Sequence, residues 1–168
     1  MIYIYNCYGG THSSALAAAY HLKKLSSDKV PSKEEILNID IFNKLKRSDM
    51  GRIIYHGEDE RGDKVYTIGR GGSKVLLPAL NHLSLLFHDT FDMKEPVIFS
   101  NTSPTVPLAM TIGGMFARGL KMNWIGVPLL IIGAKQTHQN IVNLVRHTKS
   151  QRDVCKSQSI VLENQQFI

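Results

Sequence analysis

Short apolar runs alternate along this chain with segments whose apolar residues recur at helical spacing. Residues 2–5 have the β-branched and aromatic side chains of a short strand, and residues 15–25 carry apolar side chains at the spacing of a helix. The second half repeats this order, with an apolar strand at 97–99 and a helix predicted over 106–120. The run at 129–132 is the most uniformly apolar, which predicts a central parallel strand before a last helix.

Further elements are predicted between and after these segments. Residues 53–56 and 64–68 are strand-like runs on either side of a charged loop, which predicts a β-hairpin. Ser32 and Glu35 have the spacing of a capping box and predict a short helix after Ser32. The segment at 160–162 either adds an edge strand or trails from the fold.

This alternation predicts an α/β fold with three layers, in which helices cover both faces of a mainly parallel sheet. The β-hairpin is expected as an insertion or as an antiparallel edge. We predict one domain over residues 1–150 and a polar tail over 151–168. A length of 168 residues, with 43% apolar and 20% charged side chains, suits one folded domain with a full core.

The chain is basic, with a net charge of +6 and a pI near 9.4. This charge favours anionic partners, but the lysines and arginines are spread evenly, which favours a solvated basic surface over a dedicated nucleic-acid interface. Cys7 and Cys155 do not make a disulfide framework. No signal peptide or membrane-length apolar stretch is recognisable, so we expect a cytoplasmic protein without a membrane partner.

The candidate chemistry gathers in residues 6–14, between the first strand and the first helix. Amides at a helix start have no partner within the helix, and the helix dipole adds partial positive charge there. A phosphate-containing small molecule is therefore the predicted ligand. Its amide and hydroxyl donors would be Gly9, Gly10, Thr11, Ser13 and Ser14. Cys7 and His12 are the reactive groups of the loop and the candidate catalytic residues.

Ligands of open α/β sheets bind beyond the carboxyl ends of the strands. That rule groups the N-terminal loop with the segments that follow the two later strands, at 101–105 and 133–135. Asn101, Thr102 and Lys135 are therefore predicted on the opposite wall of the same crevice.

Three known loop chemistries can be compared with this loop. A Walker A loop needs a lysine where His12 stands, so the match is poor. A cysteine phosphatase loop needs an arginine where Ser13 stands, and without it the phosphoryl oxygens lose a bidentate partner. The phosphocysteine loop of the sugar phosphotransferase B components resembles residues 7–14 more closely. Cys7 is then either a nucleophile or a small buried residue at a strand end.

Other polar groups have simpler explanations. The turn at 69–73, with Arg70, is either a second anion pocket or a flexible turn. Asp59 and Glu60 lie in an acidic cluster that could serve acid–base or magnesium chemistry, but a solvated hairpin tip explains them. The seven histidines show no zinc-ligand spacing with cysteine, so no metal site is predicted, and the cofactor stays open.

Four stretches together resemble a known family. They are Tyr5-Asn6-Cys7-Tyr8-Gly9-Gly10-Thr11-His12-Ser13-Ser14, Tyr55-His56-Gly57-Glu58-Asp59-Glu60, Val65-Tyr66-Thr67-Ile68-Gly69 and Ile112-Gly113-Gly114-Met115. In this order they resemble a short bacterial family of Gram-positive spore formers, defined as a domain of unknown function. The resemblance implies a bacterial host and brings no activity, cofactor or catalytic residue. Binding of a phosphate-containing molecule is the predicted function, with a non-enzymatic protein-interaction module or phosphocysteine transfer as alternatives.

Overall fold

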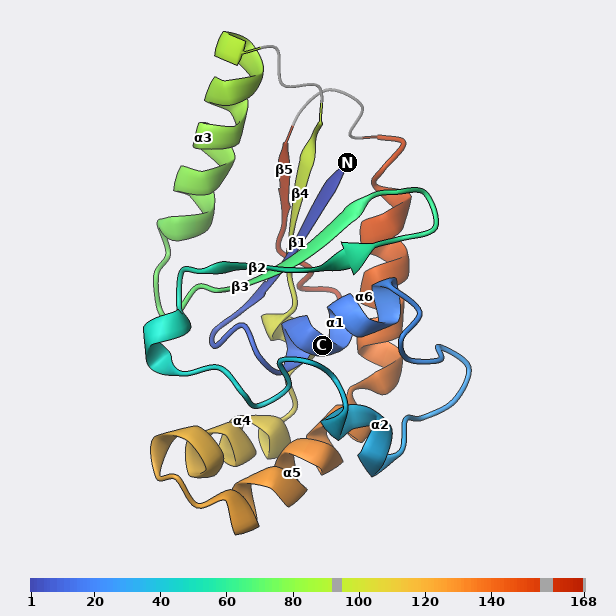
Figure 1. Ribbon diagram of the computed structural model, residues 1–168, viewed down its shortest axis with the longest axis vertical. Helices are drawn as coiled ribbons and strands as arrows, with labels where there is room; N and C mark the ends of the chain where they lie inside the picture. Colours follow the sequence, from blue (N-terminus) through green and yellow to red (C-terminus); the bar gives the residue numbers. More distant parts are fainter. Residues whose placement is uncertain (92–94, 155–158, 168) are drawn as a thin grey trace.

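The computed structural model describes residues 1–91, 95–154 and 159–167, and its centre is a five-stranded sheet with the order β2-β3-β1-β4-β5 (Figure 1). The strands are β1 (Ile2–Cys7), β2 (Ile53–Glu58), β3 (Lys64–Gly69), β4 (Val97–Asn101) and β5 (Ile160–Leu162). β2 pairs antiparallel with β3, and the other neighbours pair in parallel. The predicted α/β class with a mainly parallel sheet is confirmed, and residues 160–162 form an edge strand.

The described residues also form six α-helices. They are α1 (Ser13–His21), α2 (Lys33–Leu37), α3 (Leu76–Phe91), α4 (Leu108–Gly114), α5 (Asn123–Gln136) and α6 (His138–Ser150). One turn of π-helix, η3 (Met115–Gly119), continues α4, and short 3-10 turns lie at Arg47–Asp49 and Ser103–Thr105. The predicted capping box of α2 is confirmed, since the Glu35 amide donates to Ser32 Oγ at 3.1 Å and the Ser32 amide donates to Glu35 Oε2 at 2.7 Å.

The central strand predicted at 129–132 is wrong, because these residues lie inside α5. A run of four apolar residues suits a buried strand and a buried helix equally well. Glycines in both helices let α5 lie directly against α4. A Cβ on Gly133 would lie 2.7 Å from the Met110 amide nitrogen, and one on Gly113 would lie 2.8 Å from the Leu130 amide nitrogen. α4 and α5 therefore pack backbone against backbone beyond the carboxyl ends of β1 and β4 (Figure 1).

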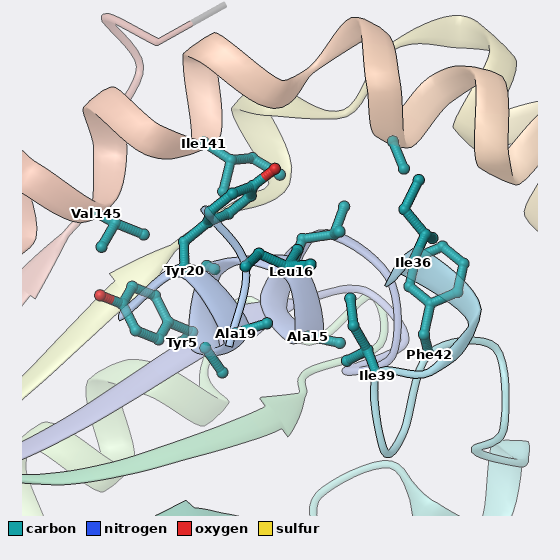
Figure 2. Close-up of a cluster of buried hydrophobic side chains, with 14 of the residues drawn as sticks. Tyr5, Ala15, Leu16, Ala19, Tyr20, Ile36, Ile39, Phe42, Ile141 and Val145 are labelled. Carbon is teal, nitrogen blue, oxygen red and sulfur yellow. The ribbon is translucent and has the colours of Figure 1, made fainter. Parts of the chain in front are cut away.

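Alternate residues of β1 enter two hydrophobic clusters. Tyr5 joins the larger cluster, in which Leu16 and Tyr20 of α1 lie between β1 and Ile141 of α6 (Figure 2). Ile4 joins a second cluster with β4 and α3. Because β1 is buried from both sides, its carboxyl end is a rigid starting point for the loop that follows.

The prediction of a solvated hairpin tip holds for Glu60 but is wrong for Asp59. The Glu60 side chain is 65% exposed, whereas that of Asp59 is 2% exposed. Asp59 Oδ2 lies 3.2 Å from both His21 Nε2 and Lys149 Nζ, and Tyr5 Oη is hydrogen-bonded to His21 Nδ1 at 2.8 Å. This buried network ties the hairpin to α1 and α6, as buried charges require partners.

Stability should fall as the pH decreases from 7 to 4, because burial lowers the pKa of His12, His21 and His56 to about 4. Unfolded histidines titrate near pH 6.5, so the unfolded chain binds more protons throughout this window. Each such histidine contributes a slope of about 1.4 kcal/mol per pH unit, measurable by urea unfolding at several pH values. His21→Gln should reduce this slope, whereas His82→Gln, at an exposed helix position, should leave it unchanged. Equal stability at pH 7 and pH 5 would contradict this prediction.

Gly126→Ala should destabilise the fold by separating α5 from the π-helical turn η3 that continues α4. Its Cβ would overlap the backbone of Ala117, and such overpacking costs about 1–3 kcal/mol, more than the gain of about 1 kcal/mol from helix propensity. Gly119→Ala is the matched control, since the nearest atom to its Cβ position is Met115 Cγ at 3.9 Å. Urea unfolding that gives the same stability for both variants would show that the helix contact tolerates a methyl group.

Candidate functional site

The loop after β1 takes its shape from a close approach of two strand ends. Gly10 has a φ of +68°, which glycine adopts without strain, and a Cβ there would lie 2.6 Å from the Gly69 amide nitrogen. A Cβ on Gly69 would in turn lie 2.8 Å from the carbonyl carbon of Gly9. The ends of β1 and β3 therefore meet backbone to backbone, and this contact turns the loop toward the start of α1.

Cys7 ends β1 with its thiol enclosed by the loop. The Gly10 amide donates to Cys7 Sγ at 3.2 Å, and Ser14 Oγ is hydrogen-bonded to Cys7 Sγ at 3.2 Å. Burial raises the pKa of the Cys7 thiol, but hydrogen bonds from the hydroxyl and amide of Ser14, from Ser13 and from Gly10 lower it further. The net pKa lies below the ordinary thiol value, so these donors favour the nucleophilic thiolate.

A cavity of about 560 Å³ opens beside this loop. Cys7, Gly9, His12 and Ser13 form its loop side. Two cations, Arg47 and Arg118, and a group of apolar side chains from α4 and η3 complete its walls. The cavity therefore combines a thiol, positive charge and an apolar surface.

Arg118 reaches over the loop from η3. A Cβ on Gly9 would overlap Arg118 Nη1, so the guanidinium occupies the space that a side chain at Gly9 would need. Its Nη2 is buried and has no hydrogen-bond partner among the described residues. Burial lowers the pKa of Arg118, nearby Cys7 and Asp49 raise it, and Arg47 lowers it, so these three groups lie close enough to act on the guanidinium.

Neither cavity arginine forms an ion pair within the described parts of the chain. Arg47 is exposed and Arg118 is half-buried. The buried Nη2 of Arg118 has lost its hydration without gaining a partner among the described residues, which is costly for a charged donor.

His12 stands on the wall of the cavity at the start of α1. Its Nε2 is hydrogen-bonded to Asn43 Oδ1 at 3.3 Å, and its ring packs edge-on against Phe42. Burial lowers the pKa of His12 to about 4, so the imidazole is neutral at pH 7. The neutral ring therefore supplies no positive charge, and its Nδ1 can act as a proton acceptor.

A family model described as a protein of unknown function (DUF3189) matches residues 2–150. The chain belongs to this family. No curated protein and no solved structure gives a significant match. The DUF3189 segment contains every residue that lines the cavity, whereas β5 lies outside it.

In this DUF3189 member, the side chains of Thr11, Ser13 and Ser14, which were predicted to bind a ligand, form hydrogen bonds within the protein. Thr11 Oγ1 donates to the Ile41 carbonyl, and Ser14 supports the thiol. Ser13 Oγ is hydrogen-bonded to Thr102 Oγ1 at 2.9 Å, and Thr102 Oγ1 donates to the Asn6 carbonyl at 2.9 Å. These contacts join the loops after β1 and β4, which the sequence predicted to lie together.

The predicted opposite wall is only partly present at the cavity. Asn101 Nδ2 donates to Glu163 Oε2 at 2.9 Å, while Asn101 Oδ1 accepts from the Ser103 amide at 3.0 Å. Asn101 and Thr102 are buried behind the cavity, and Ser103 lines it instead. Lys135 does not belong to this site, because 133–135 is the last turn of α5 and not a loop after a strand, and its exposed side chain lies near Glu34.

The turn at 69–73 is not a second anion pocket. The Arg70 and Gly71 amides donate to the Cys7 and Tyr8 carbonyls at 3.0 and 2.8 Å, and Ser73 Oγ accepts from the Leu76 amide at 3.1 Å. With its amides engaged, this turn holds the N-terminal loop in place.

Sequence reasoning missed Arg47 and Arg118, which come from segments outside all three predicted loops. One signal was present, since Arg118 is the one charged residue of the apolar stretch at 106–120. Among the described residues, no group of three or more His, Cys, Asp or Glu side chains is placed to hold a metal ion, and no helix is long and apolar enough to cross a bilayer. Cys155 lies outside the described residues.

Gly10→Ala should destabilise the protein more than Gly62→Ala. Both positions have positive φ, of +68° and +76°, so both substitutions bear a strain of about 1 kcal/mol. Only at Gly10 does the new methyl group also meet backbone, which brings the expected loss to about 2–4 kcal/mol, whereas nothing lies within 4 Å at Gly62. Urea unfolding of the two variants measures the difference, and equal losses would mean that the loop can move away from β3.

Proposed function

We propose that this DUF3189 member binds a phosphate-containing small molecule in the cavity beside the N-terminal loop. The observation that carries the proposal is the Arg118 guanidinium, which lies over Gly9 with a buried Nη2 that lacks a partner among the described residues. A buried donor without a partner is costly, and an anion of matching geometry would remove that cost.

Phosphate suits the donors around Arg118 better than a neutral ligand does. A guanidinium offers parallel N–H donors that match the oxygens of a phosphate or carboxylate, and Arg47 adds a second positive charge. The start of α1 also lies on the loop side, where helix geometry leaves amides without internal partners, whereas the Ser13 hydroxyl is taken up by Thr102. Neutral His12 donates its Nε2–H to Asn43 Oδ1, so its Nδ1 can accept a hydrogen bond or a proton.

A protein-interaction role is the second candidate, and one observation favours it. Leu108, Leu120 and Trp124 are 73%, 58% and 76% exposed on the α4–η3–α5 hairpin. Exposed large apolar side chains that gather on one element are typical of binding surfaces. In that case the cavity arginines would contribute little, and a partner would bind equally well without them.

Inorganic phosphate should raise the melting temperature of the wild-type protein, and Arg118→Ala should remove most of this increase. Binding at about a hundredfold above Kd adds roughly 2.7 kcal/mol to the unfolding free energy. Loss of a charged hydrogen-bond donor costs about 1.5–3 kcal/mol, which predicts roughly tenfold to hundredfold weaker binding for Arg118→Ala. The measurement is a thermal-shift titration with phosphate into the millimolar range.

Arg61→Ala is the charge-matched control, because Arg61 is an exposed residue of the hairpin loop. It removes one positive charge, as Arg118→Ala does, and should leave the phosphate response unchanged. Absence of stabilisation in the wild type would refute the proposal. If both variants lost the phosphate-dependent thermal shift equally, the shift would depend only on the net charge of the protein.

A further inference from the structure

The cavity holds two groups that the sequence separates and the fold brings together. The thiol of Cys7 lines it from the loop, and the guanidinium of Arg118 covers the loop from η3. We propose that Cys7 is the nucleophile of a phosphoryl transfer from phosphate monoesters with an apolar organic group, and that Arg118 binds the transferring phosphoryl oxygens. This inference rests on the proposed phosphate site and adds a reaction and a substrate class to it.

The first argument is the state of the thiol. The Gly10 amide and the Ser14 side chain hydrogen-bond to Cys7 Sγ, and the Arg118 guanidinium lines the same cavity. The hydrogen bonds to sulfur lower the pKa of Cys7 despite its burial, and a guanidinium in the same cavity also favours thiolate over thiol. A cysteine that served only as a packed apolar residue would need none of these donors.

The second argument is that the absence of a side chain at Gly9 leaves room for the Arg118 guanidinium. A cysteine phosphatase loop has an arginine at the position that Ser13 occupies here. The Ser13 hydroxyl is already hydrogen-bonded to Thr102 Oγ1. A side chain at Gly9 would overlap the Arg118 guanidinium, so the missing side chain admits an arginine from another part of the chain. The buried Nη2 without a partner among the described residues is the second, independent sign of a ligand, in addition to the thiol.

The third argument concerns the organic part of the substrate. A volume of about 560 Å³ is far larger than one phosphate group needs. Away from the loop, Val106, Met110 and Met115 line it with apolar side chains, beside the hydroxyls of Ser103 and Thr111. The apolar side chains outnumber these hydroxyls. Aryl or alkyl phosphates therefore fit this cavity better than sugar phosphates, whose hydroxyls would lose their hydration there.

The reaction balances with water as the second substrate. The Cys7 thiolate attacks phosphorus, a P–S bond forms, and the ester P–O bond breaks. The leaving oxygen takes a proton from solvent water and departs as an alcohol or phenol. Water then attacks the phosphocysteine, the P–S bond breaks, and inorganic phosphate and the Cys7 thiolate are released, with the remaining proton passing to solvent. Arg118 stabilises the negative charge on the equatorial oxygens in both steps.

The test is turnover of p-nitrophenyl phosphate by the full chain, with acid-quenched mass spectrometry to detect a phosphorylated Cys7 peptide. Cys7→Ser should abolish turnover and labelling while keeping the thermal shift with inorganic phosphate. Arg118→Ala should reduce kcat/KM by about a hundredfold or more, and Arg118→Lys by less, since lysine keeps the charge without the planar fork. Glucose 6-phosphate should be a poorer substrate than p-nitrophenyl phosphate. Cys155→Ser and Arg61→Ala are the matched controls and should retain activity.

The outcomes separate this inference from the binding proposal. A phosphate-dependent thermal shift without turnover or labelling of any aryl, alkyl or sugar phosphate would overturn the reaction and leave the binding site standing. Turnover that survives in Cys7→Ser would assign the chemistry to another group. Preference for glucose 6-phosphate would overturn the apolar substrate class. Absence of both thermal shift and turnover would refute the binding site together with the reaction.

Discussion

A Cβ atom on Gly10 would lie 2.6 Å from the Gly69 amide nitrogen, so the ends of β1 and β3 touch through their backbones. This contact bends the N-terminal loop back over the end of the sheet and brings the Gly10 amide to the Cys7 thiol. The turn after β3 reinforces it, because its amides donate to the carbonyls of Cys7 and Tyr8. The position of the thiol is thus a consequence of strand packing, and the buried strand β1 makes that position rigid.

The other half of the cavity depends on a second backbone contact. Gly113 and Gly133 let α4 and α5 pack more closely than side chains would allow, and Gly126 does the same for α5 and η3. The π-helical turn η3, which carries Arg118, lies between α4 and α5 in the chain, and Gly9 leaves the space that the guanidinium fills. Two glycine contacts, one at the end of the sheet and one between helices, therefore place the Cys7 thiol and the Arg118 guanidinium on the same cavity.

The charge states of the cavity residues depend on how deeply each residue is buried and on its hydrogen bonds. His12 is held neutral by burial, the two arginines have no ion pair within the described residues, and the thiol carries donors that favour its anion. Elsewhere the fold pairs its buried charges, as it does for Asp59 with His21 and Lys149. The buried network at Asp59 thus satisfies its charges internally, whereas the cavity arginines have no ion-pair partner among the described residues.

The sequence alone determined the features that arise from local interactions. The α2 capping box, the paired strands of the hairpin and the strand–loop–helix at Cys7 each depend on residues close together in the chain. The tertiary structure decided the rest. The run at 129–132 became helical because the α4 backbone lies against Gly133, and Asp59 became buried because His21 and Lys149 reach it from other helices. Arg118 joined the loop only through packing, since a side chain brought in from a distant helix leaves no periodicity or spacing for a sequence pattern to detect.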